Sequence, residues 1–173
     1  MTPLCIVVMG VCGSGKSSVA QALATAFNYR LIDGDDLHPR ANIDKMKNGI
    51  PLNDLDREPW LKIVSDVIYS FKQRSLGSVI VCSALKKSYR DILRHDNDNV
   101  VFIHLYAPFD TILDRVMNRK GHYMKESMVK SQFDTLEYPN ANEKDVYTID
   151  VTPSLDTVNK MAIKTIEELY NAK

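Results

Sequence analysis

Short, uninterrupted apolar runs recur along the chain and are the clearest signal of its fold. A run of this length that is rich in β-branched residues is typical of a strand in a parallel sheet covered on both faces. We therefore expect four doubly buried strands and a fifth, shorter one. The four are Leu4–Met9, Ser78–Ser83, Val100–Ala107 and Val146–Val151, and the shorter one is Arg30–Ile32.

Between these runs, apolar residues recur three and four positions apart, which predicts amphipathic helices. The stripes begin at Val19, Trp60, Ile112 and Leu155. Strands that alternate with helices are joined by right-handed crossovers, so the pattern predicts a three-layer, doubly wound α/β fold with a parallel sheet. Ligands of such sheets bind beyond the carboxyl ends of the strands.

Length and charge narrow the class of protein. The 173 residues contain no repeat or linker, so we expect a single domain over residues 1–173. Lys and Arg number 22, as do Asp and Glu, which argues against nucleic-acid and anionic-membrane partners. No apolar run is long enough to span a bilayer. The apolar N-terminal run lacks a basic leader and a cleavage site, and we expect a cytoplasmic protein.

A glycine-rich loop follows the first predicted strand. The string GVCGSGKS, residues 10–17, matches the pattern G-x-x-x-x-G-K-[ST] between a strand and a helix. Its backbone N–H groups and the positive helix end favour phosphate, Lys16 would reach the β- and γ-phosphates, and Ser17 would ligate Mg²⁺. The predicted nucleotide-binding residues of the loop are Gly10, Gly13, Ser14, Gly15, Lys16, Ser17 and Ser18.

The metal requires an acidic partner at the end of a neighbouring strand. The runs VIVCSA and VFIHLYA end without a carboxylate, and Asp150 follows the last strand, where it more naturally opens a loop. By elimination, Asp33 is the expected metal-side acid. In an extended segment, residues i and i+2 point the same way, so Asp35 would face the same cleft and accept a proton there. The alternative is a solvated Asp/Gly turn.

Further motifs distinguish two possible functions of a chain with such a loop, a GTP-dependent switch and a kinase. No glycine follows an Asp at D-x-x-G spacing, and NKMA at residues 159–162 lacks the acid of N-K-x-D, so a GTP-dependent switch is not indicated. The segment DRVMNRKGHYMK places Arg115 and Arg119 four residues apart on one side of a helix end. It is similar to the arginine pair of adenylate kinases, which implies that Arg115 packs on the base and Arg119 neutralises transition-state charge. The alternative is a solvated basic helix end.

One longer stretch is more specific than any of these motifs. DGDDLHPRANIDKMKNGIPLNDLDREPWL, residues 33–61, resembles the gluconokinase family, and VCSALKKSYRD, RKGHYM and QFDTLEYP extend the resemblance. It implies the fold of nucleoside monophosphate and shikimate kinases, with a five-stranded parallel sheet. It also implies a substrate-binding helical segment at about 37–74, a mobile lid at about 119–138 and a homodimer.

The resemblance also implies the chemistry: ATP, with Mg²⁺, phosphorylates D-gluconate at its 6-hydroxyl. By similarity to shikimate kinases, Asp35 would deprotonate that hydroxyl and Arg57 would hold the substrate carboxylate. The remaining substrate contacts would come from His38, Asn42, Lys45 and Lys86.

Several of these residues could instead have a purely structural role. His38 would otherwise cap the following helix, and Asn42 and Lys45 would form an exposed helix face. Trp60 and His104 sit in apolar patterns and are expected in the core.

Two other functions remain open. A shikimate-kinase-like enzyme would show a glycine triplet where this chain has CSAL, and a regulator that only binds nucleotide would need no second carboxylate beside Asp33.

Overall fold

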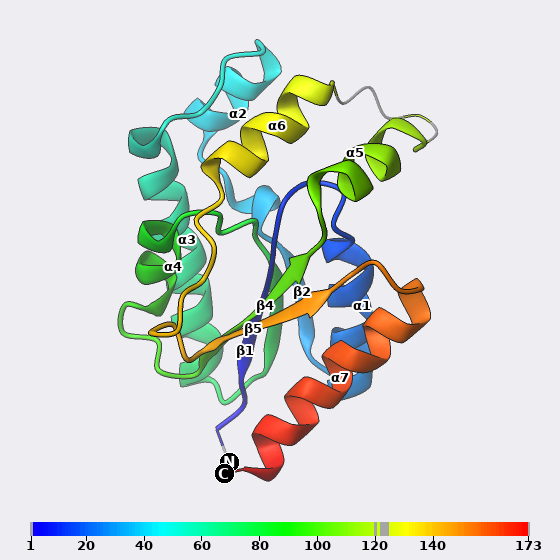
Figure 1. Cartoon of the computed structure of the whole chain (residues 1–173). Coiled ribbons are helices and arrows are strands. Elements are labelled where there is room, and N and C mark those ends of the chain that lie inside the picture. The colour runs from blue at the N-terminus through cyan, green and yellow to red at the C-terminus, as the bar shows by residue number, and fades with distance from the viewer. Residues whose placement is uncertain (1, 120, 122–124, 173) are drawn as a thin grey trace.

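The computed structural model describes residues 2–119, 121 and 125–172. A parallel sheet of order β2-β3-β1-β4-β5 forms the middle layer, with helices on both faces (Figure 1). This confirms the predicted doubly wound α/β fold. The strands are β1 (Cys5–Met9), β2 (Arg30–Asp33), β3 (Ser78–Val81), β4 (Val100–Tyr106) and β5 (Val146–Asp150).

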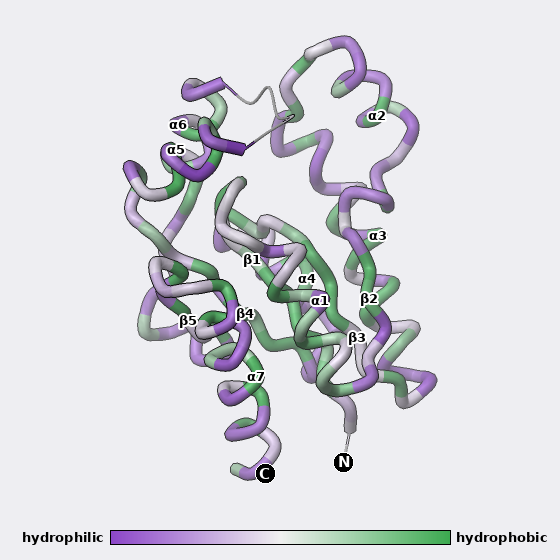
Figure 2. The backbone as a smooth tube through the Cα atoms, turned by 90° about the vertical axis from the view of Figure 1, so that its right-hand side faces the viewer, coloured by the Kyte–Doolittle hydropathy of each residue, from purple (hydrophilic) through white to green (hydrophobic). Residues whose placement is uncertain are grey.

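The helices cover the two faces of the sheet and its carboxyl edge. They are α1 (Lys16–Phe27), the 3₁₀ helix η1 (Gly34–Leu37), α2 (Arg40–Lys47), α3 (Asp54–Gln73), α4 (Lys87–Arg94), α5 (Phe109–Met117), α6 (Glu126–Thr135) and α7 (Leu155–Asn171). Helices α1 and α7 pack together on one face, and α3 and α4 on the other. In Figure 2, α2 lies on one side beyond the strand ends and α5 and α6 lie on the other.

Strand β1 shows why an uninterrupted apolar run is needed at the centre of such a sheet. Successive side chains of a strand point to opposite faces. Ile6 and Val8 therefore join the core under α1 and α7, whereas Val7 and Met9 join the core under α3. Both faces of the strand are dry, so no polar position is tolerated.

The last predicted strand is not doubly buried as expected. In β5 only Ile149 is buried, because the strand lies at the edge of the sheet and pairs with β4 alone. The sequence pattern also did not predict α4 or α6 as helices, since each is short and carries few apolar residues.

Two core assignments are confirmed. Trp60 is 7% exposed, and His104 is 1% exposed with its Nδ1 3.2 Å from the Thr148 hydroxyl. Within residues 2–119, 121 and 125–172, no helix combines the length and apolar character that a bilayer crossing needs.

Candidate active site

The glycine-rich loop runs from the end of β1 to the first residue of α1. Gly15 is the N-cap residue and has φ of +91°, a left-handed conformation that glycine adopts without steric penalty. Within the described residues no side chain caps this helix end, and its first turn holds no acid. The first N–H groups of α1 and its positive end are therefore available to an anion.

Lys16 lies across the loop. Its Nζ donates to the carbonyl oxygens of Gly10 at 3.0 Å and Val11 at 2.9 Å. Burial lowers the pKa of Lys16, while the charges of Cys12 and Asp35 oppose that shift. The Gly10 N–H donates to the Ser83 carbonyl oxygen at 3.2 Å and Gly34 lies against the Val81 carbonyl, so the loop and the acidic turn after β2 both lie at the carboxyl end of β3.

The acidic turn differs from the extended segment that the spacing predicted. Residues Gly34–Leu37 form a 3₁₀ helix, and the Asp33 carboxylate caps it by accepting the Asp35 N–H at 3.0 Å. The prediction of two parallel side chains on extended backbone is wrong, because the local N-cap bond turns the chain. The groups of the site are still close together. Partial desolvation by the surrounding elements, then the charge of Asp33, raises the pKa of Asp35, whereas the charges of His38 and Lys16 lower it. The desolvation is only partial, because 83% of the Asp35 side-chain surface is exposed.

Gly34 fixes the position of this turn. A Cβ at Gly34 would lie 2.5 Å from the carbonyl oxygen of Val81 in β3, so the turn can approach the sheet only with glycine there. On its other side, the Gly34 carbonyl accepts the indole N–H of Trp60 at 2.8 Å. The turn is thereby held between β3 and α3.

Of the predicted substrate residues, His38 lies near Asp35, and Asn42 lies against His38. The His38 ring stacks on Trp60 with centroids 4.1 Å apart, and its Nε2 is 3.8 Å from Asp35 Oδ1. Asn42 is 3% exposed and contacts His38 Nδ1 at 3.2 Å. The alternatives for these two residues are therefore wrong: the N-cap of α2 is Pro39, with no side-chain cap, and Asn42 is buried. The side chain of Lys45, named with Asn42 in the second alternative, is 37% exposed.

The three predicted cations differ in how they are paired. Lys45 binds both carboxylate oxygens of Asp56 at 2.8 and 2.9 Å, and Lys86 binds those of Asp54 at 3.1 and 3.0 Å. Arg57 forms no ion pair with any carboxylate in the described part of the chain.

Arg57 is held instead by Tyr89. Its Nη1 is 3.4 Å from the Tyr89 hydroxyl, and its guanidinium lies 5.9 Å from the centre of the tyrosine ring. Tyr89 in turn donates a short hydrogen bond to Asp54. That bond, followed by the bond from Lys86, lowers the pKa of Asp54. Sequence reasoning missed Tyr89, because one tyrosine in a short helix carries no motif.

The arginine pair lies on the other side of the site. Arg115, in the last turn of α5, donates from Nη2 to the carbonyl oxygen of Val151 at 2.6 Å, which places it against the segment after β5. Arg119 is exposed just beyond α5. Of the lid predicted at about 119–138, residues 120 and 122–124 lie outside the described residues, and α6 forms much of the rest.

Helix α6 reaches the glycine-rich loop through one residue that the sequence did not single out. The Gln132 side-chain oxygen accepts the backbone N–H of Cys12 at 3.2 Å. A glutamine without a repeating pattern around it gives no signal of such a contact.

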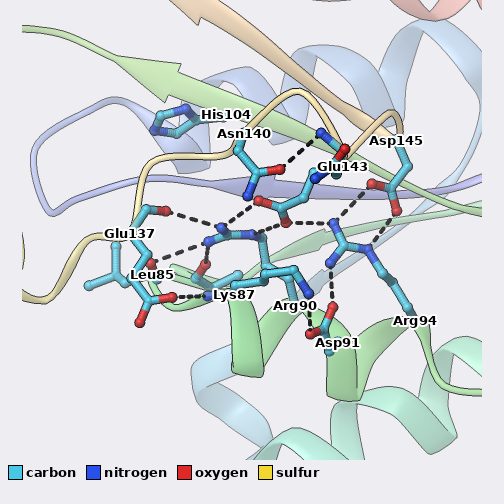
Figure 3. A network of polar contacts seen from close by, with 12 residues as sticks. Leu85, Lys87, Arg90, Asp91, Arg94, His104, Glu137, Asn140, Glu143 and Asp145 are labelled. Atoms are coloured by element: carbon cyan, nitrogen blue, oxygen red, sulfur yellow. Dashed lines mark hydrogen bonds and ion pairs between the residues drawn. The ribbon is translucent and has the colours of Figure 1, made fainter.

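A buried ion network anchors the segment that follows α6, and it too was missed (Figure 3). Arg90 is 0% exposed; its Nε and Nη2 donate to the Glu143 carboxylate at 2.7 and 2.9 Å, and its Nη1 donates to the Ala84 carbonyl at 2.9 Å. Arg94 adds a bond to Glu143 and two to Asp145. The network joins α4 to the loop before β5.

The donor set fits a hard cation that shares its ligands with phosphate. Among the described residues, no group of three or more His, Cys, Asp or Glu side chains could hold a metal by itself. Mg²⁺ is ordinarily held by one or two protein oxygens together with water and substrate phosphates. Ser17, in the first turn of α1, and Asp33, at the end of β2, are suitable oxygens for that arrangement.

Together these groups are suited to phosphoryl transfer. The loop and Lys16 can hold a triphosphate, Asp35 can accept a proton from an attacking hydroxyl, and Arg57 can bind an anionic acceptor.

Comparison with known proteins agrees with this geometry. The family model described as Shikimate kinase matches residues 12–169. The thermoresistant gluconokinase of Escherichia coli is 48% identical over 94% of this chain and 93% of its own length. The thermosensitive gluconokinase of the same organism is 44% identical over 92% of this chain and 86% of its own length.

A solved structure matches as well. The crystal structure of a gluconokinase from Sinorhizobium meliloti superposes with a TM-score of 0.86 at 40% identity, covering 99% of this chain and 98% of the other. By these matches and by its site, the chain belongs to the shikimate kinase family of P-loop kinases and, within it, to the gluconokinases.

Proposed function

We propose that this chain transfers the γ-phosphoryl group of ATP to the 6-hydroxyl of D-gluconate, giving 6-phospho-D-gluconate and ADP. Relatives at 44 and 48% identity are named gluconokinases. The observation that carries the proposal is Arg57, whose guanidinium is held by the Tyr89 hydroxyl at 3.4 Å and forms no ion pair with a carboxylate among the described residues. A planar guanidinium matches a carboxylate with two parallel hydrogen bonds, and gluconate carries a carboxylate at one end.

We assign the nucleotide side of the site to the loop, to α1 and to the two arginines Arg115 and Arg119. Backbone N–H groups hold the phosphates, and Arg115 packs on the base. Lys16 and Arg119 neutralise charge on the transferring group. Mg²⁺, when bound to Ser17 and to Asp33, directly or through water, neutralises charge on the β- and γ-phosphates. The phosphate-binding residues are Gly10, Gly13, Ser14, Gly15, Lys16, Ser17 and Ser18.

On the acceptor side, Asp35 takes the proton of the 6-hydroxyl. The hydroxyl oxygen then forms a bond to the γ-phosphorus while the bond from that phosphorus to the β–γ bridging oxygen breaks, and ADP leaves with the electron pair. Arg57 holds the carboxylate of gluconate. His38, Asn42, Lys45 and Lys86 surround its hydroxyl-bearing chain.

Three further expectations concern the setting of the enzyme. It acts in the cytoplasm, as a homodimer, without a nucleic-acid or membrane partner. The balanced charge of 22 basic and 22 acidic residues supports the last point, because nucleic acids and anionic membranes bind proteins that carry an excess of basic residues. Sedimentation velocity checks the dimer.

An ADP-release assay with gluconate, shikimate or no acceptor tests the proposal. Turnover that requires gluconate, with ³¹P NMR showing a new phosphomonoester, is the expected result. Turnover with shikimate instead would support the shikimate-kinase-like alternative. Equal ADP release without any acceptor would show an ATPase and contradict the proposal.

A further inference from the structure

His38 is held more rigidly than a side chain that only touches substrate needs to be. Its side chain is 5% exposed and lies flat on Trp60, with an interplanar angle of 18°. Trp60 is itself fixed by its bond to Gly34. The imidazole thus has one orientation, with Nδ1 toward Asn42 and Nε2 toward Asp35.

The hydrogen bonds of Asn42 decide which ring nitrogen carries the proton. Asn42 Nδ2 lies 2.9 Å from the backbone carbonyl oxygen of Asp56, which can only accept, so this atom is the amide nitrogen. The same nitrogen lies 3.2 Å from His38 Nδ1, and its second hydrogen is free to donate there. Nδ1 must then accept, and a neutral ring keeps its proton on Nε2.

The ring is neutral near pH 7. Burial lowers the pKa of His38, Arg57 lowers it further, and only Asp35 opposes them. A neutral His38 therefore presents an N–H to the Asp35 carboxylate, with 3.8 Å between Nε2 and Oδ1.

We propose that His38 is a positioning residue for Asp35: its Nε2–H binds one carboxylate oxygen and leaves the other to face the acceptor hydroxyl. The inference rests on the proposed function. The present separation exceeds a hydrogen bond by about 1 Å, a distance that a small rotation of the exposed Asp35 side chain removes when the substrate binds.

This role predicts a loss in the chemical step rather than in binding. A carboxylate without a fixed partner samples rotations in which neither oxygen faces the hydroxyl, and a misplacement of about 1 Å can cost about 100-fold in rate. We therefore expect kcat to fall by about 10- to 100-fold when the Nε2–H is removed.

The test uses variants that distinguish the packing of the His38 ring on Trp60 from the hydrogen bond that its Nε2–H donates. His38→Phe keeps a ring on Trp60 but donates nothing, and should lose kcat while the KM for ATP stays constant. His38→Gln places an amide N–H near the position of Nε2 and should recover part of that loss. His95→Phe, at a histidine 80% exposed, is the matched control and should behave as the wild type.

Two results would overturn the inference. One is a normal kcat in His38→Phe with only a higher KM for gluconate, which would make His38 a plain substrate contact. The other comes from long-range ¹H–¹⁵N NMR of the protein labelled at histidine, with His38 assigned from the His38→Phe spectrum. The inference requires protonated Nε2 at pH 7.5, and a protonated Nδ1 contradicts it.

These failures differ from a failure of the proposed function. If the wild type phosphorylates gluconate and His38→Phe has the same kcat, only the role of His38 is contradicted. If the wild type does not phosphorylate gluconate, both the proposed substrate and the role of His38 are contradicted.

Discussion

The indole N–H of Trp60 donates to the carbonyl oxygen of Gly34 at 2.8 Å, joining residues 26 positions apart. Trp60 belongs to α3 and Gly34 opens η1, so this bond ties a helix of the outer layer to the turn that carries Asp35. The same indole supports the His38 ring. One buried side chain thus supports both the turn that carries Asp35 and the ring of His38.

Replacing Trp60 by Phe keeps an aromatic ring under His38 but removes the donor to Gly34. A buried carbonyl that loses its partner costs about 1–3 kcal/mol. We expect urea denaturation to show a loss of that size in the free energy of unfolding, and kcat to fall with it. Tyr69→Phe, at a half-exposed position of the same helix, is the control. Equal stability of the two variants would contradict this account.

Arg57→Lys keeps the charge but removes the planar fork. A lysine offers a point charge where two parallel hydrogen bonds are needed, so we expect the KM for gluconate to rise by about 10- to 100-fold. The KM for ATP should not change. Lys62→Met, at an exposed position of the same helix, serves as the control for steady-state assays. A larger effect on ATP than on gluconate would remove Arg57 from the acceptor site.

Much of the fold could be predicted because its signals are local. Successive side chains of β1, such as Ile6 and Val7, are buried on opposite faces of the sheet, so the strand appears in the sequence as a continuous apolar run. The glycine-rich loop directly after that run is also a local signal. The edge position of β5 could not be predicted, since strand order is set by distant pairings that no single run encodes.

The candidate site divides in the same way. The loop residues were predicted from their motif, and Asp33 and Asp35 from elimination and spacing. The extended backbone assumed for Asp33 to Asp35 was wrong, because Asp33 caps a 3₁₀ turn. Tyr89 and Glu143 were not found. Glu143 pairs with Arg90, which lies 53 positions earlier in the sequence, and nothing in the sequence around either residue indicates that pairing.

Glu143→Gln should strongly destabilise the fold. It leaves Arg90 fully buried without a counter-charge, and breaking a buried pair in this way costs about 3–5 kcal/mol. The free energy of unfolding in urea measures the loss. Glu167→Gln, at an exposed position of α7, should change it by no more than about 0.5 kcal/mol. If the two variants lose the same stability, the network does not hold the loop.

His104 makes stability depend on pH. Burial, followed by the charge of Arg90, lowers the pKa of His104 to about 4, against about 6.5 in an unfolded chain. Between these values the unfolded state binds more protons, so stability is complete above about pH 6.5 and falls by about 3 kcal/mol as the pH drops to 4. His38 contributes in the same direction.

Denaturation of the wild type and of His104→Gln at a series of pH values checks this. The variant should lose less stability between pH 7 and 4 than the wild type does. Parallel curves for the two proteins would show that His104 does not titrate in this way.

The most direct test of the account is a rapid-quench single turnover with γ-³²P-labelled ATP and gluconate, comparing the wild type, Asp35→Asn and Asp36→Asn. Because an amide cannot take the proton of the hydroxyl, Asp35→Asn should transfer label to gluconate at least about 100-fold more slowly while binding ATP normally. Asp36→Asn, at the neighbouring exposed acid, should match the wild type. Transfer by Asp35→Asn at the wild-type rate would contradict the account.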